Sequence, residues 1–143
     1  MEESLRTVVA GMIGGALMGL LFLAHISILL VNHPPSALLK RATVSNVSRL
    51  ITISAFVTFV GWNVLAILMS FAAQGILEMS SLGVTFAPSV DYLFILAFLT
   101  LLIVIPSFVM FRDRKIHVFA ELLVFLGVFG FLIPNLVVAV HNL

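Results

Sequence analysis

Four long runs of apolar residues divide the chain, and each is long enough to cross a membrane as a helix. The runs cover residues 7–31, 50–73, 92–111 and 116–140. The first three contain no formally charged side chain, and the fourth contains one acid, Glu121. Because a helix of about 20 apolar residues spans roughly 30 Å of hydrocarbon, the pattern predicts four transmembrane helices.

The composition agrees with a chain whose main solvent is lipid. Of its 143 residues, 62% are apolar and 9% are charged, whereas a soluble domain carries about 25% charged residues. We therefore expect an all-α integral membrane protein that forms a single four-helix domain over residues 1–143, with no soluble domain. A cleavable signal peptide is not expected, because the first apolar run is long and follows Glu2 and Glu3 rather than a basic segment.

The basic residues predict how the chain sits in its membrane. With four crossings, the connections at residues 32–49 and 112–115 lie on one side, and they hold six of the seven basic residues. Basic loops are retained on the cytoplasmic side. We therefore expect both basic loops to face the cytoplasm or matrix, and both termini to face the opposite side.

The first run carries a stripe of glycines. Gly11, Gly15 and Gly19 recur every four residues, so on a helix they share one face. A face without side chains lets another helix approach closely and gain dispersion contacts. The pattern predicts tight helix packing there, and it leaves open whether the partner belongs to this chain, to a second copy or to a different protein.

Ionisable residues inside two of the runs form the most specific chemical feature. Counting 1.5 Å per residue, His25 lies about 9 Å inside the end of the first helix, and Glu121 lies about 7.5 Å inside the fourth from the same side. His117 precedes Glu121 by one turn and shares its face. An ionisable group in a membrane is a functional-site hypothesis by default.

Three interpretations of His25, His117 and Glu121 stay open. The first is structural, with the side chains satisfying each other or a neighbouring subunit. The second is a proton or cation pathway in which Glu121 titrates and His25 relays protons. The third is a metal or haem site, for which His25 is the best single ligand. The metal and cofactor remain unspecified, while lipid contacts are expected.

Two amides and a proline add packing hypotheses. Asn63 and Asn135 lie within the second and fourth runs, and we expect each to make a polar contact between helices. Pro134 has no N–H, so it leaves the carbonyl of Gly130 without its usual donor, and we expect a kink there.

No nucleophile–base pair, phosphate loop or dinucleotide motif is present, so we do not expect an enzyme acting on its own. The net charge of +1 supplies no field to attract nucleic acid. The leading hypothesis is an accessory subunit of a larger membrane complex, such as a respiratory or photosynthetic one, docked through the glycine face. Its partners would be lipids and other transmembrane subunits, with a hetero-oligomer favoured over a homo-oligomer. The alternatives are a homo-oligomeric channel or transporter with a Glu/His site, and a haem- or metal-binding membrane anchor.

Overall fold

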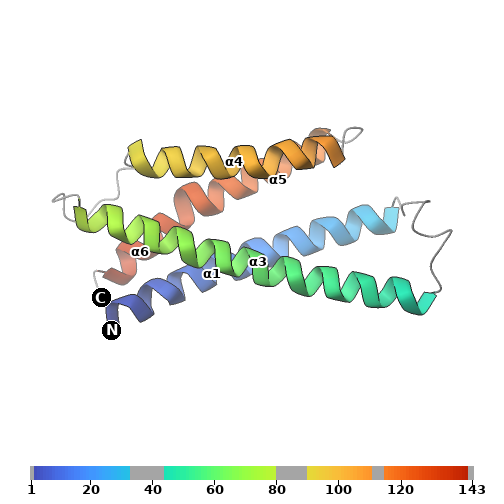
Figure 1. Cartoon of the computed structure of the whole chain (residues 1–143), viewed down its shortest axis with the longest axis horizontal. Helices are drawn as coiled ribbons and strands as arrows, with labels where there is room; N and C mark the ends of the chain where they lie inside the picture. The colour runs from blue at the N-terminus through green and yellow to red at the C-terminus, as the bar shows by residue number, and fades with distance from the viewer. Residues whose placement is uncertain (1, 33–43, 80–89, 111–114, 142–143) are drawn as a thin grey trace.

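The computed structural model describes residues 2–32, 44–79, 90–110 and 115–141, and all of these are helical (Figure 1). With the labels of Figure 1, the elements are α1 (Glu2–Asn32), α3 (Val44–Met79), α4 (Val90–Met110), α5 (Lys115–Gly127), the π-helical turn η1 (Val128–Leu132) and α6 (Ile133–His141). The described residues contain no strand. The predicted all-α class is therefore confirmed for this part of the chain.

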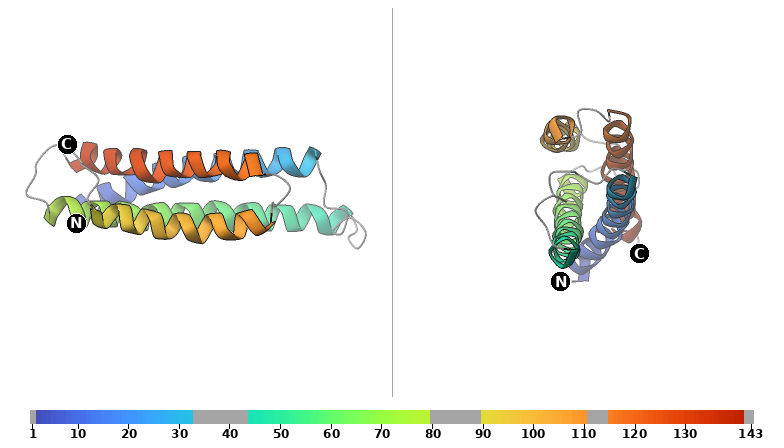
Figure 2. Two further views of the ribbon diagram at one scale, coloured as in Figure 1. Left: turned by 90° about the horizontal axis from the view of Figure 1, so that it is seen from above. Right: turned by 90° about the vertical axis from the view of Figure 1, so that its right-hand side faces the viewer.

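The helices lie lengthwise in one elongated bundle. α1 and α3 run in opposite directions and make the most extensive contact (Figure 1). α5, η1 and α6 follow one another as a single long rod that packs on α1 and α3. α4 lies at the edge of the bundle, against α5 and η1 (Figure 2). The start of α1 and the end of α6 lie at the same end of the bundle (Figure 1).

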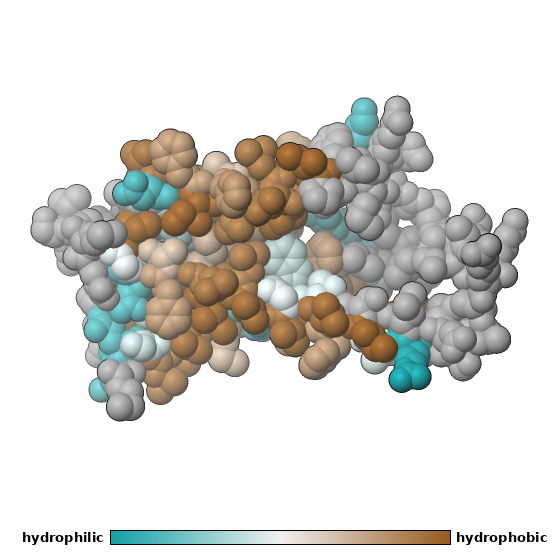
Figure 3. Space-filling view, in the orientation of Figure 1, coloured by the Kyte–Doolittle hydropathy of each residue, from teal (hydrophilic) through white to brown (hydrophobic). Residues whose placement is uncertain are grey.

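Length and composition make several helices able to cross a membrane. Three segments meet both criteria, Glu2–His25, Ile51–Ile76 and Lys115–Val140, and Val90–Ile105 in α4 is a shorter apolar stretch. On the face shown in Figure 3, apolar side chains cover most of the described surface between the two ends. Phe94 and Phe131 are each 71% exposed. An apolar exterior of this extent suits lipid rather than water.

The helices extend beyond the predicted boundaries. The second helix begins at Val44 and ends at Met79, whereas the apolar run covers only 50–73. Residues 44–49 of the predicted basic loop are therefore helical, and so is Gln74. The apolar run marks only the part of a helix that matches hydrocarbon, and the helix continues where polar residues reach the interface. Lys40, Arg41, Arg112 and Arg114, which support the predicted orientation, lie outside the described residues.

The glycine stripe lies against α3 of the same chain. A Cβ atom on Gly11 would lie 2.6 Å from the Cα of Ile67, and one on Gly15 would lie 2.5 Å from the Cα of Asn63. A Cβ on Gly19 would lie 2.8 Å from the ring of Phe59. Only hydrogen fits at these distances, so the two helices approach closely. In this structure the stripe is covered and is not a surface open to another subunit.

A π-helical turn precedes Pro134. The N–H of Ile133 donates to the carbonyl of Val128, five residues earlier, instead of to Phe129 as in an α-helix. If this five-residue spacing continues, the carbonyl of Phe129 should accept a hydrogen bond from residue 134. That residue is Pro134, which has no N–H. The carbonyl deprived of a backbone donor is therefore that of Phe129. The expectation for Gly130 assumed α-helical spacing, which the π-turn changes by one residue.

Candidate functional site

His25 on α1 and Glu121 on α5 meet inside the bundle. The Nε2 atom of His25 lies 3.5 Å from Oε1 of Glu121, and the two side chains are 25% and 16% exposed. The two residues lie at similar distances from the same end of the bundle, and the helices that carry them are in contact. Equal depth on adjacent antiparallel helices is what brings the two side chains together.

His117 completes the group. It precedes Glu121 by one turn of α5, and its ring centroid lies 5.2 Å from that of His25 with the ring planes at 70°. His117 is exposed, whereas His25 and Glu121 are partly buried. We call these three residues the His–Glu cluster. It joins the bundle interior to the exterior of α5.

The His25–Glu121 contact leaves hydrogen-bonding capacity unused. Among the described residues, the Nε2 atom of His25 is buried and has no hydrogen-bond partner. Hydrogen bonds between an ionised nitrogen donor and a carboxylate are typically about 2.7–2.9 Å long, shorter than the 3.5 Å found here. A buried polar atom without a partner is unfavourable. Such an atom beside a carboxylate marks a place where a proton or a ligand would be stabilised.

Two hollows adjoin Glu121. The larger has a volume of about 150 Å³ and is lined by Met18, Leu21, Phe22, His25, Ala120, Glu121 and Val124. A smaller one of about 20 Å³ shares Met18, Phe22 and Glu121 and extends to Trp62 and Phe125. The larger hollow has room for several water molecules. The carboxylate is therefore accessible to small species without unfolding of the bundle.

The acid of the cluster is a group that a cation would stabilise. The cluster holds one carboxyl group, Glu121, and two imidazoles, His25 and His117. A carboxylate removed from water is unfavourable unless a positive group compensates it. A proton on His25 or on Glu121, or an added cation, would supply that compensation.

Each of the two asparagines donates a hydrogen bond within its own helix. The Nδ2 atom of Asn63 donates to the carbonyl of Phe59 at 2.9 Å, and that of Asn135 donates to Phe131 at 2.7 Å. Both bonds return to the residue's own helix, because a short amide reaches the carbonyl one turn back. Asn63 still lies at the α1–α3 interface beside Gly15. Asn135 is exposed, and its contact with another helix stays a prediction.

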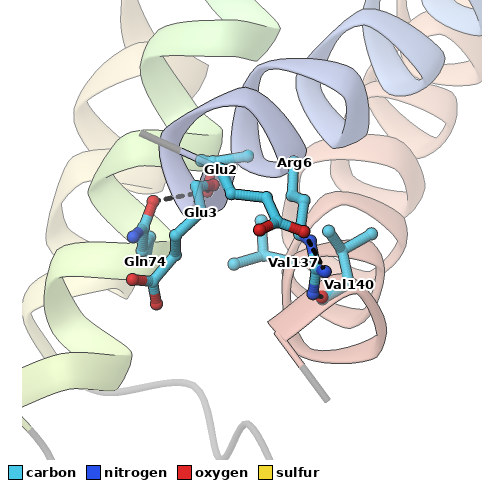
Figure 4. Close-up of a pocket in the computed structure, with 7 residues that line it drawn as sticks. Glu2, Glu3, Arg6, Gln74, Val137 and Val140 are labelled. Atoms are coloured by element: carbon cyan, nitrogen blue, oxygen red, sulfur yellow. Dashed lines mark hydrogen bonds and ion pairs between the residues drawn. The ribbon is translucent and has the colours of Figure 1, made fainter. Parts of the chain in front are cut away.

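A second polar pocket lies at the opposite end, where α1 begins (Figure 4). Its volume is about 200 Å³, and it is lined by Glu2, Glu3, Arg6, Thr7, Gln74, Val137 and Val140. Arg6 donates to Glu2 at 2.8 Å and to the carbonyl of Val140 at 3.4 Å. The hydroxyl of Thr7 pairs with Oε1 of Gln74. These contacts tie α1 to α3 and α6, so the pocket is explained by the joining of helix ends.

The described residues give no set of three ligands for a metal ion. Within the described ranges, no three His, Asp or Glu side chains lie close enough together to hold a metal ion. The His–Glu cluster therefore has three titratable groups in contact but lacks the convergence that a metal requires. A metal site built from three such side chains therefore receives no geometric support from this part of the chain.

Three side chains with structural roles were missed in the sequence. Tyr92 is fully buried and its hydroxyl donates to the carbonyl of Phe129. Thr7 and Gln74 join α1 to α3. One signal could have drawn attention to Tyr92: it is the single tyrosine of the chain, and it stands at the start of an apolar run. Nothing in the sequence paired any of the three with its partner.

The comparisons with known proteins give no match: no protein-family model, no curated protein and no solved structure is similar to this chain.

Proposed function

We propose that this chain is a small membrane transporter or channel that binds a proton or a small cation at the His–Glu cluster. The observation that carries the proposal is the 3.5 Å contact between His25 and Glu121 inside an apolar bundle. The carboxyl group of Glu121 and the adjoining hollow support the proposal, because they provide an acidic group and space for a small species to enter.

The residue types suit proton exchange. Imidazole is the side chain that gains and loses a proton near neutral pH, and a carboxylate beside it can take the same proton. Packing alone does not call for either group, since apolar residues of similar size fill a membrane bundle at lower cost. The exposed His117 would pass protons between the exterior and the buried pair.

The proposal includes a topology. The helices cross four times, the start of α1 and the end of α6 face outside, and the basic connections face the cytoplasm or matrix. The His–Glu cluster then lies toward the side of the basic connections. A proton entering there would reach Glu121 before it met the aromatic core.

The test is proton flux into vesicles that contain the purified protein and a pH-sensitive dye. We expect Glu121→Gln to reduce flux at least tenfold and His25→Gln to reduce it by less. Asp91→Asn, which removes an exposed carboxylate at the start of α4, is the matched control and should leave flux unchanged. Equal flux in wild type and Glu121→Gln would overturn the proposal.

A second function is favoured by one observation. Asn135 exposes an amide on a face that it shares with the exposed Phe131, and lipid cannot pair with an amide. A helix of another subunit could, which favours an accessory subunit of a larger membrane complex. Its docking surface would be this face, because α3 covers the glycine stripe. Native mass spectrometry after gentle extraction should then show different, stoichiometric partners, whereas a free monomer would refute it.

A further inference from the structure

Aromatic side chains line the two hollows together with the carboxyl group of Glu121. Phe22 lines both hollows together with Glu121, and its ring contacts that of Trp62 at 5.5 Å, edge to face. Trp62 in turn lies 6.1 Å from Phe125, which follows Glu121 by one helical turn. One carboxylate is thus held beside several aromatic rings.

This chemistry selects among cations. Aromatic faces attract a cation within about 6 Å of the ring centroid, most strongly when the ion is desolvated. Calcium or magnesium would require about six oxygen ligands. Among the described residues, the lining of the two hollows offers one carboxylate and no other oxygen-bearing side chain. An alkylated ammonium ion carries its charge on a methyl surface, so it suits an apolar wall with one acid.

We infer that Glu121, His25 and the ring of Phe22 form a binding site for a small alkylated ammonium ion. Glu121 is the counter-ion, Phe22 is the cation–π partner and Met18 forms an apolar wall. The volume of about 150 Å³ beside His25 limits the ligand to a few heavy atoms. This inference rests on the proposed function and names its substrate class.

One carboxylate cannot neutralise two cations at once. An ammonium ion and a proton therefore compete for Glu121, and each is released when the other binds. In a transporter, this competition would couple the release of one species to the binding of the other. It also predicts that acid weakens ammonium binding.

The test uses tetramethylammonium as the probe and tryptophan fluorescence as the signal. Trp62 is the only tryptophan of the chain, and it lines the smaller hollow, so the signal reports on this site. We expect a saturable change in emission with tetramethylammonium and none with tert-butanol, a neutral molecule of similar shape. Lowering the pH should weaken the binding.

Three variants define the site. Glu121→Gln should weaken tetramethylammonium binding at least tenfold, and Asp91→Asn should leave it within twofold of wild type. Phe22→Leu keeps the charge and should weaken binding by about two- to thirtyfold. If Glu121→Gln does not fold, tetramethylammonium binding by Phe22→Leu still tests the inference.

The outcomes separate this inference from the proposed function. If proton flux depends on Glu121 but tetramethylammonium gives no saturable signal, the substrate class is wrong and the proton site stands. If the probe binds through Glu121 without proton flux, the ammonium site stands and the transport function fails. Binding that is unchanged in both Glu121→Gln and Phe22→Leu would overturn the inference.

Discussion

The hydroxyl of Tyr92 donates a hydrogen bond of 2.5 Å to the backbone carbonyl of Phe129. This bond joins α4 to η1, the place where Pro134 and the π-turn deprive that carbonyl of a backbone donor. Tyr92 and Phe129 are both fully buried, so neither water nor lipid headgroups can substitute. A side chain of α4 thus supplies the donor that the backbone of η1 lacks, and this hydrogen bond stabilises the packing of α4 on the bundle.

Tyr92→Phe should destabilise the protein by about 1–2 kcal/mol, because it leaves a buried carbonyl unpaired. The measurement is the free energy of unfolding in mixed micelles. Pro134→Ala supplies the missing N–H and should reduce the effect of Tyr92→Phe in the double variant. The same loss in both backgrounds would show that the hydroxyl and the proline are not coupled.

Gly11→Ala and Gly15→Ala should each destabilise the bundle by about 1–3 kcal/mol, since the added methyl group overpacks the α1–α3 contact. Gly61→Ala is the matched control, because nothing lies within 4 Å of a Cβ at that position. Because alanine has a higher helix propensity than glycine, Gly61→Ala should leave the free energy of unfolding unchanged or raise it by up to about 1 kcal/mol. Similar losses at all three positions in thermal unfolding would contradict the close contact.

The polar link at the other end of α1 predicts a coupling between two residues. Thr7→Val removes the hydroxyl that pairs with Gln74, and interhelical hydrogen bonds in membranes contribute about 0.6 kcal/mol on average. A double-mutant cycle of Thr7→Val with Gln74→Leu should give a coupling of that order. Zero coupling would mean that the contact does not hold α1 to α3.

Asn135→Leu should leave the fold's stability within about 0.5 kcal/mol of wild type, as is usual for exposed positions. The amide bonds only to its own helix among the described residues, so the fold does not depend on it. Unfolding of the purified variant checks this value. Loss of a co-purifying subunit from the native membrane, with stability unchanged, would identify this face as a docking surface.

The sequence by itself determined the class of the protein. Uncharged runs of 20 or more residues force the backbone to satisfy its own hydrogen bonds in lipid, so helices followed from hydropathy alone. The depth of His25 and Glu121 was also readable, because each residue advances a helix by a constant rise. The ends of the helices could not be read in this way, because polar helical segments such as residues 44–49 carry no hydropathy signal.

Only the tertiary structure decided which faces meet. The glycine stripe is equally smooth toward any helix, and its contact with Ile67 and Asn63 depends on how α3 crosses α1. The pairing of His25 with Glu121 required α1 and α5 to be neighbours, which connection lengths do not specify. The link from Tyr92 to Phe129 depended on a π-turn that shifts the hydrogen-bond register by one residue. These contacts depend on packing between segments that are distant in the sequence, and a local sequence pattern does not specify such packing.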